Sequence, residues 1–149
     1  MAIGERIHHF RLLRGFTQKY LGQQLGFSDS QADVRIAQYE KGARSPKEKY
    51  LNALADIFEV SPHALAVPDI DSYVGLMHTL FTLEDLYGLH IDEIDGELCL
   101  RLDKSKGTTY LSMFDMFHEW QKQAEKLKSG EITQEEYDQW RYNYPKNTK

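Results

Sequence analysis

Basic and amide side chains recur between residues 35 and 44, where Arg35 and Gln38 are followed by Lys41 and Arg44. A guanidinium group can pair with guanine through two hydrogen bonds, and a glutamine amide can pair in the same way with adenine. Each such pair is worth about 1–3 kcal/mol of discrimination against the wrong base. Lysine and arginine also bind backbone phosphates. The chemistry that these residue types suggest is therefore recognition of double-stranded DNA.

Other candidate chemistries are poorly supported by the residue pattern. His8 and His9 are adjacent, so on a helix they point to different sides and cannot chelate one metal ion together. His118-Glu119 lacks a second histidine four residues after the first, so it is not a zinc-protease motif. Cys99 lies on an expected strand and is predicted to be inert. We therefore expect no catalytic residue, no metal site and no cofactor.

The elements that must position the basic residues are predicted by apolar residues that recur at helical spacing over the first 67 residues. The first helix is expected to end near Gly15, and the second is expected to run from an N-cap at Thr17 to Gly26. The third helix should end at Gly42. The fourth helix should begin at Ser45-Pro46 and the fifth at Ser61-Pro62. The residues expected in the shared core of these five helices are Leu21, Leu25, Ile36, Tyr39 and Leu54. Five short helices in roughly 65 residues predict a compact all-α unit.

One stretch of this unit carries a recognisable motif. It reads Thr-Gln-Lys-Tyr-Leu-Gly-Gln-Gln-Leu-Gly-Phe-Ser over residues 17–28, followed by Ile-Ala-Gln-Tyr-Glu-Lys-Gly from Ile36 and by Arg44-Ser-Pro. This pattern resembles the helix-turn-helix of phage-repressor-like bacterial regulators, the lambda and 434 repressor superfamily that is often called the Xre family. The resemblance covers about residues 3–66. It implies a five-helix DNA-binding fold whose recognition helix enters the major groove.

Two helices must cross tightly in such a motif, and Gly22 and Gly26 stand where a small residue and a sharp turn are needed. Thr17 would cap the second helix, whose free backbone N–H groups can hold a phosphate. Glu40 is expected to be a structural partner of a basic side chain or amide, because its charge would repel phosphate. By resemblance, Gln18 would brace the phosphate contact at the N-terminal end of the second helix. The full set of expected DNA-binding residues is Thr17, Gln18, Lys19, Gln31, Arg35, Gln38, Lys41 and Arg44.

The spacing within the motif departs from the family pattern. Thirteen positions separate Gly26 from Tyr39, where the family usually has nine, so four extra residues lie between Ser28 and Asp33. They either lengthen the turn or add a turn of helix. The contacts of Gln31, Asp33 and Val34 stay open for this reason. An aspartate near phosphate would be repulsive unless it caps the helix or accepts a hydrogen bond from cytosine.

The second half of the chain has a different pattern. After Ala66-Val67-Pro68-Asp69, a long helix is expected to end at about Tyr87. Two strands joined by the turn Asp95-Gly96 should follow it. A helix is then expected over about residues 108–128, and a short last helix should begin at a capping box at Thr133. The register predicts Ile91 opposite Leu100, with the apolar face of the hairpin resting on the helices. The fold class is therefore mainly α: a five-helix helix-turn-helix domain at 1–67, then a small α+β domain at 68–149. Residues from Lys128 also resemble a short SHOCT-type motif.

Charge divides the chain in the same place. The 149 residues carry a net charge of -5, but residues 1–67 hold nine basic and seven acidic residues, whereas residues 68–149 hold nine basic and 16 acidic residues. Residues 1–44 alone hold seven basic and four acidic residues. No long apolar run or secretory leader is evident. With a single cysteine, this composition predicts a cytoplasmic protein without membrane association.

Three functions compete at this point. The first is a sequence-specific DNA-binding repressor that dimerises through its acidic C-terminal half and binds paired half-sites. The second is an antitoxin or adaptor-type interaction protein whose C-terminal half binds a partner protein. The third is an enzyme such as a self-cleaving repressor, which is not expected because the second half offers no Ser/Lys dyad in a β-rich domain. The first is preferred.

Overall fold

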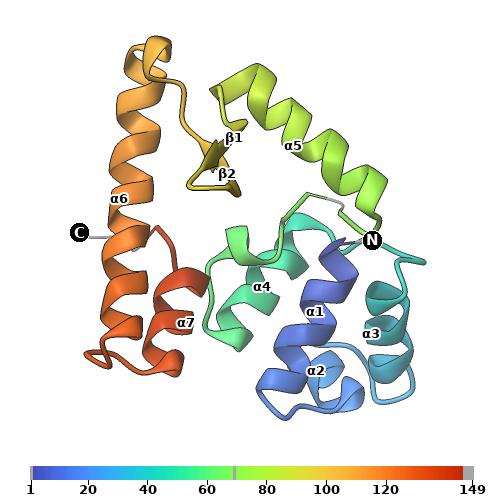
Figure 1. Ribbon diagram of the computed structural model, residues 1–149. Helices are drawn as coiled ribbons and strands as arrows, with labels where there is room; N and C mark the ends of the chain where they lie inside the picture. Colours follow the sequence, from blue (N-terminus) through green and yellow to red (C-terminus); the bar gives the residue numbers. More distant parts are fainter. Residues whose placement is uncertain (1, 69, 146–149) are drawn as a thin grey trace. The chain divides into compact units, whose positions relative to one another are not determined.

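The computed structural model describes residues 2–68 and 70–145, and its elements are shown in Figure 1. They are α1 (Ala2–Leu13), α2 (Gln18–Gln24), α3 (Ala32–Glu40), α4 (Glu48–Phe58), η1 (Pro62–Ala64), α5 (Tyr73–Tyr87), β1 (His90–Ile94), β2 (Glu97–Arg101), η2 (Lys104–Lys106), α6 (Thr108–Lys128) and α7 (Gln134–Tyr142). The predicted fold class is confirmed, since helices dominate and the strands form a two-stranded sheet. The fifth helix of the first domain is the 3-10 helix η1.

Contacts within the chain divide it into two units. One contains the residues up to 71 and the segment from 138 onward, and the other contains residues 72–137. The C-terminal segment belongs with the first unit because Tyr142 packs edge-on against Phe10, with ring centroids 4.9 Å apart. The Tyr142 carbonyl also accepts a hydrogen bond from the Ser61 amide at 2.9 Å. This division differs from the expected one, which kept 68–149 together.

The first unit is built around one apolar core. It draws side chains from α1, α2, α3, α4 and the segment after α4, with the following residues buried: Ile7, Phe10, Leu21, Ile36, Tyr39, Leu54, Ala55, Phe58, Val60 and Leu65. Four of the five expected core residues are among them, and Leu25 packs against the cluster half-buried. The helical spacing of apolar residues therefore located this core correctly.

Helix starts agree with the sequence at two places and differ at a third. The Thr17 hydroxyl accepts a hydrogen bond from the Tyr20 amide at 3.0 Å, and the Ser61 hydroxyl accepts one from the His63 amide at 3.2 Å. Helix α4, however, begins at Glu48, with Lys47 as an N-cap residue that makes no side-chain cap. The prediction that Ser45-Pro46 opens this helix is wrong, because Lys47 is still in the extended conformation and the helical backbone begins only after it.

The hairpin of the second unit has the predicted register. Ile91 lies opposite Leu100 in antiparallel strands, and Asp95 and Gly96 make the two-residue turn with φ values of 53° and 83°. These left-handed values belong to the turn type that Asp-Gly favours, because it matches the twist of the strands. At the start of α7 the predicted capping box is also present, since the Glu136 amide donates to the Thr133 hydroxyl at 3.1 Å.

The expectation that helices cover the hairpin's apolar face is wrong. Leu98 is 78% exposed and Ile91 is 62% exposed, whereas His90 and Cys99 on the opposite face are half-buried. None of the buried hydrophobic side chains among the described residues comes from residues 72–137. The described part of the second unit therefore has no fully buried apolar side chain, and many of the apolar residues of α5, the hairpin and α6 are exposed.

Over residues 2–68 and 70–145, no helix combines the length and the apolar character needed to cross a membrane.

Candidate nucleic-acid interface

Helices α2 and α3 meet at a glycine, as the sequence predicts. Gly22 is buried, and a Cβ atom built on it would lie 2.2 Å from the Ala32 carbonyl oxygen at the start of α3. No side chain fits in that space, so the two backbones touch directly. Gly26 acts differently, because it has a φ of +87° in the turn that follows α2. The first glycine sets the distance between the helices, and the second lets the chain turn.

The extra residues between the two helices form a turn. The Ser28 carbonyl accepts hydrogen bonds from the amides of Gln31 and Ala32, both at 2.9 Å. The Gln23 side chain donates to the Asp29 carboxylate at 2.8 Å and holds the turn against α2. Helix α3 begins only at Ala32. Of the two alternatives left open by the sequence, the longer turn is the observed one.

Helix α3 has an inward face and an outward face. Ala32, Ile36 and Tyr39 are buried in the core. A second set of residues, spaced three and four apart along the chain, shares the opposite side of the helix. It consists of Val34, Ala37, Gln38 and Lys41. With Gln18, Asp33 and Ala43 they line a shallow hollow on the surface. The outward side of α3 is therefore a recessed, mixed polar and apolar surface.

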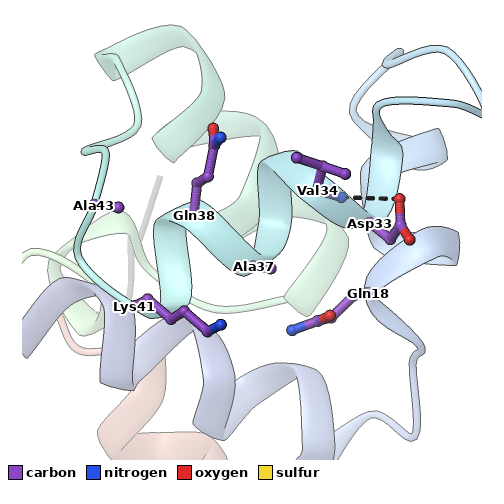
Figure 2. A pocket seen from close by; sticks show the side chains of 7 residues that line it. All are labelled: Gln18, Asp33, Val34, Ala37, Gln38, Lys41 and Ala43. Carbon is purple, nitrogen blue, oxygen red and sulfur yellow. Dashed lines mark hydrogen bonds between the residues drawn. The ribbon is translucent and has the colours of Figure 1, made fainter.

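Figure 2 shows how these side chains lie around the hollow. Gln18 and Lys41 extend toward each other along one side of α3, whereas Val34 and Gln38 project from the other side, with Ala37 between. The Asp33 carboxylate accepts a hydrogen bond from the Val34 amide at 2.9 Å, in the first turn of the helix. An acid at this end of a helix interacts favourably with the helix dipole. The hollow thus offers amide, apolar and charged groups side by side.

Glu40 joins three segments of the first unit. Its side chain is 7% exposed and accepts hydrogen bonds from Arg11 of α1 and from the Gln18 amide of α2, the latter at 2.9 Å. His8 lies 3.0 Å from the same carboxylate. The prediction that Glu40 is a structural partner is confirmed. Its carboxylate holds Gln18 beside the outward face of α3.

The surroundings of Glu40 stabilise the ionised form of its side chain. Burial by itself would raise the pKa of this carboxyl group, but the hydrogen bonds from Arg11, Gln18 and His8 together outweigh it. The pKa of Glu40 therefore lies below its ordinary value, and the group is a carboxylate at neutral pH. The buried Arg11, only 8% exposed, consequently has its counter-charge.

The structure brings only some of the predicted site residues together. Gln18, Gln38 and Lys41 line the hollow, whereas Arg35 and Gln31 do not. The Arg35 guanidinium lies over the Phe27 ring, 5.8 Å from its centroid, on the flank of α3. Gln31 is the exposed N-cap residue of α3 and makes no side-chain cap.

The remaining predicted residues lie at the edges of the two helices. Thr17 caps α2, and Lys19 is exposed in the first turn of that helix. Arg44 is exposed in the loop after α3, which folds back so that its amide donates to the Gln38 carbonyl at 3.2 Å. Within the part of the chain that the structure describes, the side chains of Lys19, Lys41 and Arg44 make no ion pair.

Three other arginines of the N-terminal segment have structural partners. Arg11 pairs with Glu40, Arg6 donates to the Ala64 carbonyl at 3.0 Å, and Arg14 donates to the Phe58 carbonyl at 2.8 Å. The last contact satisfies a carbonyl at the C-terminal end of α4. The excess of positive charge in residues 1–44 is therefore only partly available to a ligand.

Sequence reasoning left Val34 and Asp33 open and missed Ala37 and Ala43 as residues that line the hollow. Counting three and four residues from Val34 along α3 leads to Ala37 and Gln38, so helical spacing could have found the first alanine. Ala43 follows the helix, and its place depends on how the loop folds back. No pattern in the sequence marks it.

Comparison with known proteins matches the N-terminal region. A family model described as a helix-turn-helix domain matches residues 2–67. In Bacillus subtilis (strain 168), the uncharacterized HTH-type transcriptional regulator YazB is 35% identical over 66 residues, which is 44% of this chain and 90% of that protein. Among solved structures, the transcriptional regulator BswR is similar with a TM-score of 0.43 and 24% identity, covering 57% of this chain and 95% of that one.

Proposed function

The chain belongs to the helix-turn-helix transcriptional regulators, and from this premise we propose that it is a sequence-specific repressor of the Xre type. Such a protein binds double-stranded DNA through its recognition helix, which here would be α3. A protein that regulates transcription acts where the DNA is, so we place it in the cytoplasm. The proposed function is one of binding and includes no catalytic step.

The observation that carries the proposal is the outward face of α3. Its side chains line an open hollow, and Gln38 projects from α3 there with the oxygen and nitrogen of its amide at the tip of the side chain (Figure 2). A glutamine amide in the major groove can pair with adenine. The Glu40 network supports this arrangement, since it fixes α1 and α2 against α3.

Lys19, Lys41 and Arg44 would supply the phosphate contacts. They are exposed at the edges of α2 and α3, and their side chains have no acidic partner among the described residues. The Gln18 amide uses one N–H group for Glu40, which leaves its second N–H group for a phosphate. Contacts of this kind position the protein on the duplex, and base contacts then specify the site. Arg35, by contrast, is assigned to the flank of the interface.

We assign dimerisation to the second unit, within the proposed domain 68–149. Helix-turn-helix repressors read paired half-sites, so two copies must be held together. The exposed apolar residues of 72–137 support this assignment, because large exposed apolar patches mark interaction sites and the buried centre of a dimer interface is mostly apolar. Leu98 and Ile91 are largely exposed and would lie in that centre. The antitoxin or adaptor alternative uses the same surface for a different partner protein, and the state of association in solution separates the two.

A binding experiment tests the proposal. The full-length protein would select an operator from a library of random duplexes, and its Kd for that operator would be measured over a series of salt concentrations. Gln38→Ala should weaken operator binding by about 5-fold to 150-fold and leave non-specific binding nearly unchanged. Lys41→Ala and Arg44→Ala should each reduce the slope of log K against log salt by about one.

Lys122→Ala is the matched control, since it removes the same charge from an exposed position on α6. Its salt slope should equal that of the wild type. Failure to select any sequence, or a salt slope that Lys41→Ala and Arg44→Ala leave unchanged, would contradict DNA binding through this face.

A further inference from the structure

Val34 is an apolar residue in an unusual place. It is β-branched, 44% exposed, and lies on the outward face of α3, whereas Ala32, Ile36 and Tyr39 of the same helix are buried. Burial in the protein therefore does not explain a valine here. Ala37, one turn further along, presents a second apolar surface beside it (Figure 2).

The cations of α3 are not placed to read bases beside Val34. The Arg35 guanidinium lies over Phe27 on the flank of the helix, and Lys41 is at the C-terminal end of α3. The residues of α3 that line the hollow before Lys41 are thus Asp33, Val34, Ala37 and Gln38, which supply one carboxylate, two apolar side chains and one amide. This combination does not suit guanine, which presents two acceptors in the major groove and is read by Arg or Lys.

Thymine is the base that an apolar group can recognise. Its 5-methyl group is the apolar feature of the major-groove edge, and it contacts residues such as alanine or the methyl of threonine in protein–DNA interfaces. Removing one such group from water is worth about a fourfold change in Kd. Val34 and Ala37 both line the hollow, so they offer two apolar side chains to such a methyl group.

We propose that Val34 is a specificity-determining residue that packs on the 5-methyl group of a thymine in the operator half-site. This inference rests on the proposed function and names the base class that α3 reads. Gln38 is one turn from Val34, a rise of about 6 Å along the helix. With base pairs spaced about 3.4 Å apart, the adenine that Gln38 reads lies within about two base pairs of that thymine.

The test replaces each thymine of the selected operator, one at a time, by deoxyuridine, which keeps the base pair and lacks only the methyl group. For the full-length wild-type protein, one position in each half-site should show Kd raised about fourfold. Val34→Ala should bind the thymine operator more weakly and should show a smaller difference between thymine and deoxyuridine at the same position, because two methyl groups that contact the base are removed. Val34→Thr retains one methyl group and should keep part of it.

Arg35→Ala is the matched control, because its side chain lies on the flank of the same helix. It should keep the full deoxyuridine effect. The inference is overturned if no thymine position matters to the wild type, or if Val34→Ala retains the same effect as the wild type. Both results would leave DNA binding intact, whereas a protein that selects no operator at all would contradict the proposed function itself.

Discussion

Glu40 shows how a single residue can organise a binding surface that it does not itself form. Its carboxylate is buried, pairs with Arg11 and accepts a hydrogen bond from Gln18. Its partner Arg11 also donates to the Phe16 carbonyl at 2.9 Å, so the same network ties α1 to the loop that leads into α2. The removal of one member of a buried ion pair leaves the other charge uncompensated, which costs more than the loss of a surface pair.

Glu40→Gln should therefore destabilise the protein by about 3–5 kcal/mol, because it leaves Arg11 buried without an anion. The measurement is urea unfolding at neutral pH. Glu59→Gln is the control, since that carboxylate is 80% exposed and 3.9 Å from Arg14. Its unfolding midpoint should stay close to that of the wild type.

The acid sensitivity of the protein should follow the same residue. The pKa of Glu40 is lower in the folded chain than its ordinary value of 4.5, so the unfolded chain takes up this proton first as pH falls. The stabilisation is complete above about pH 5 and is lost as pH drops through the folded pKa. Glu40→Gln should unfold with a shallower dependence on pH in this range. An unchanged dependence would mean that other carboxyl groups control it.

At the scale of elements, the contact between α2 and α3 fixes the position of α3, the proposed recognition helix. Gly22 lets the backbone of Ala32 approach, and the four-residue turn from Ser28 brings the start of α3 to that point. Alanine normally favours a helix over glycine. Here its methyl group would overlap backbone, which cannot move as a flexible side chain can.

Gly22→Ala should consequently destabilise the protein by about 1–3 kcal/mol despite the gain in helix propensity. The urea midpoint should fall with an unchanged m-value, and affinity for the operator should fall with it. Gln24→Ala, an exposed neighbour in the same helix, provides the comparison and should be neutral or slightly stabilising. Equal stabilities of the two variants would show that α2 and α3 can separate at no cost.

For the whole molecule, the distribution of charge and of apolar surface matters more than the totals. The net charge of -5 averages a basic N-terminal segment and an acidic remainder, and exposed charges further apart than about 8 Å are largely screened at physiological salt. Apolar surface is divided as well. The first unit has a closed core, whereas residues 72–137 expose Leu98, Ile91 and an aromatic set from α5 and α6.

The exposed hairpin predicts the state of association. The full-length protein should be a dimer by light scattering, and Leu98→Glu should shift it to the monomer because a charge would be placed in the interface. The same variant should bind a two-half-site operator more weakly than the wild type. Leu12→Glu changes a leucine of α1 that is 57% exposed, and it should remain dimeric. A wild-type monomer would favour the adaptor alternative.

Much of the fold followed from local pattern. Helical spacing located the core residues Leu21, Ile36 and Tyr39, and Asp95-Gly96 predicted the hairpin with its register. Glu40 was assigned correctly from the sign of its charge. These features depend on residues close in the chain or on one-sided periodicity, and both can be read from residue types alone.

Long-range contacts decided the rest. Arg6, Arg11 and Arg14 are used by carbonyl and carboxylate groups 29 to 58 positions away, so charge counting overestimated the cations left for DNA. The Arg35 guanidinium lies over the Phe27 ring, so Val34 and Gln38, and not Arg35, line the hollow on the outward face of α3. By itself, the sequence predicted a helix-turn-helix whose third helix ends at Gly42, and in the structure this helix ends at Glu40. Only the tertiary structure decided which arginines are available to DNA, because the partners of Arg6, Arg11 and Arg14 lie far along the chain, where local pattern does not reach.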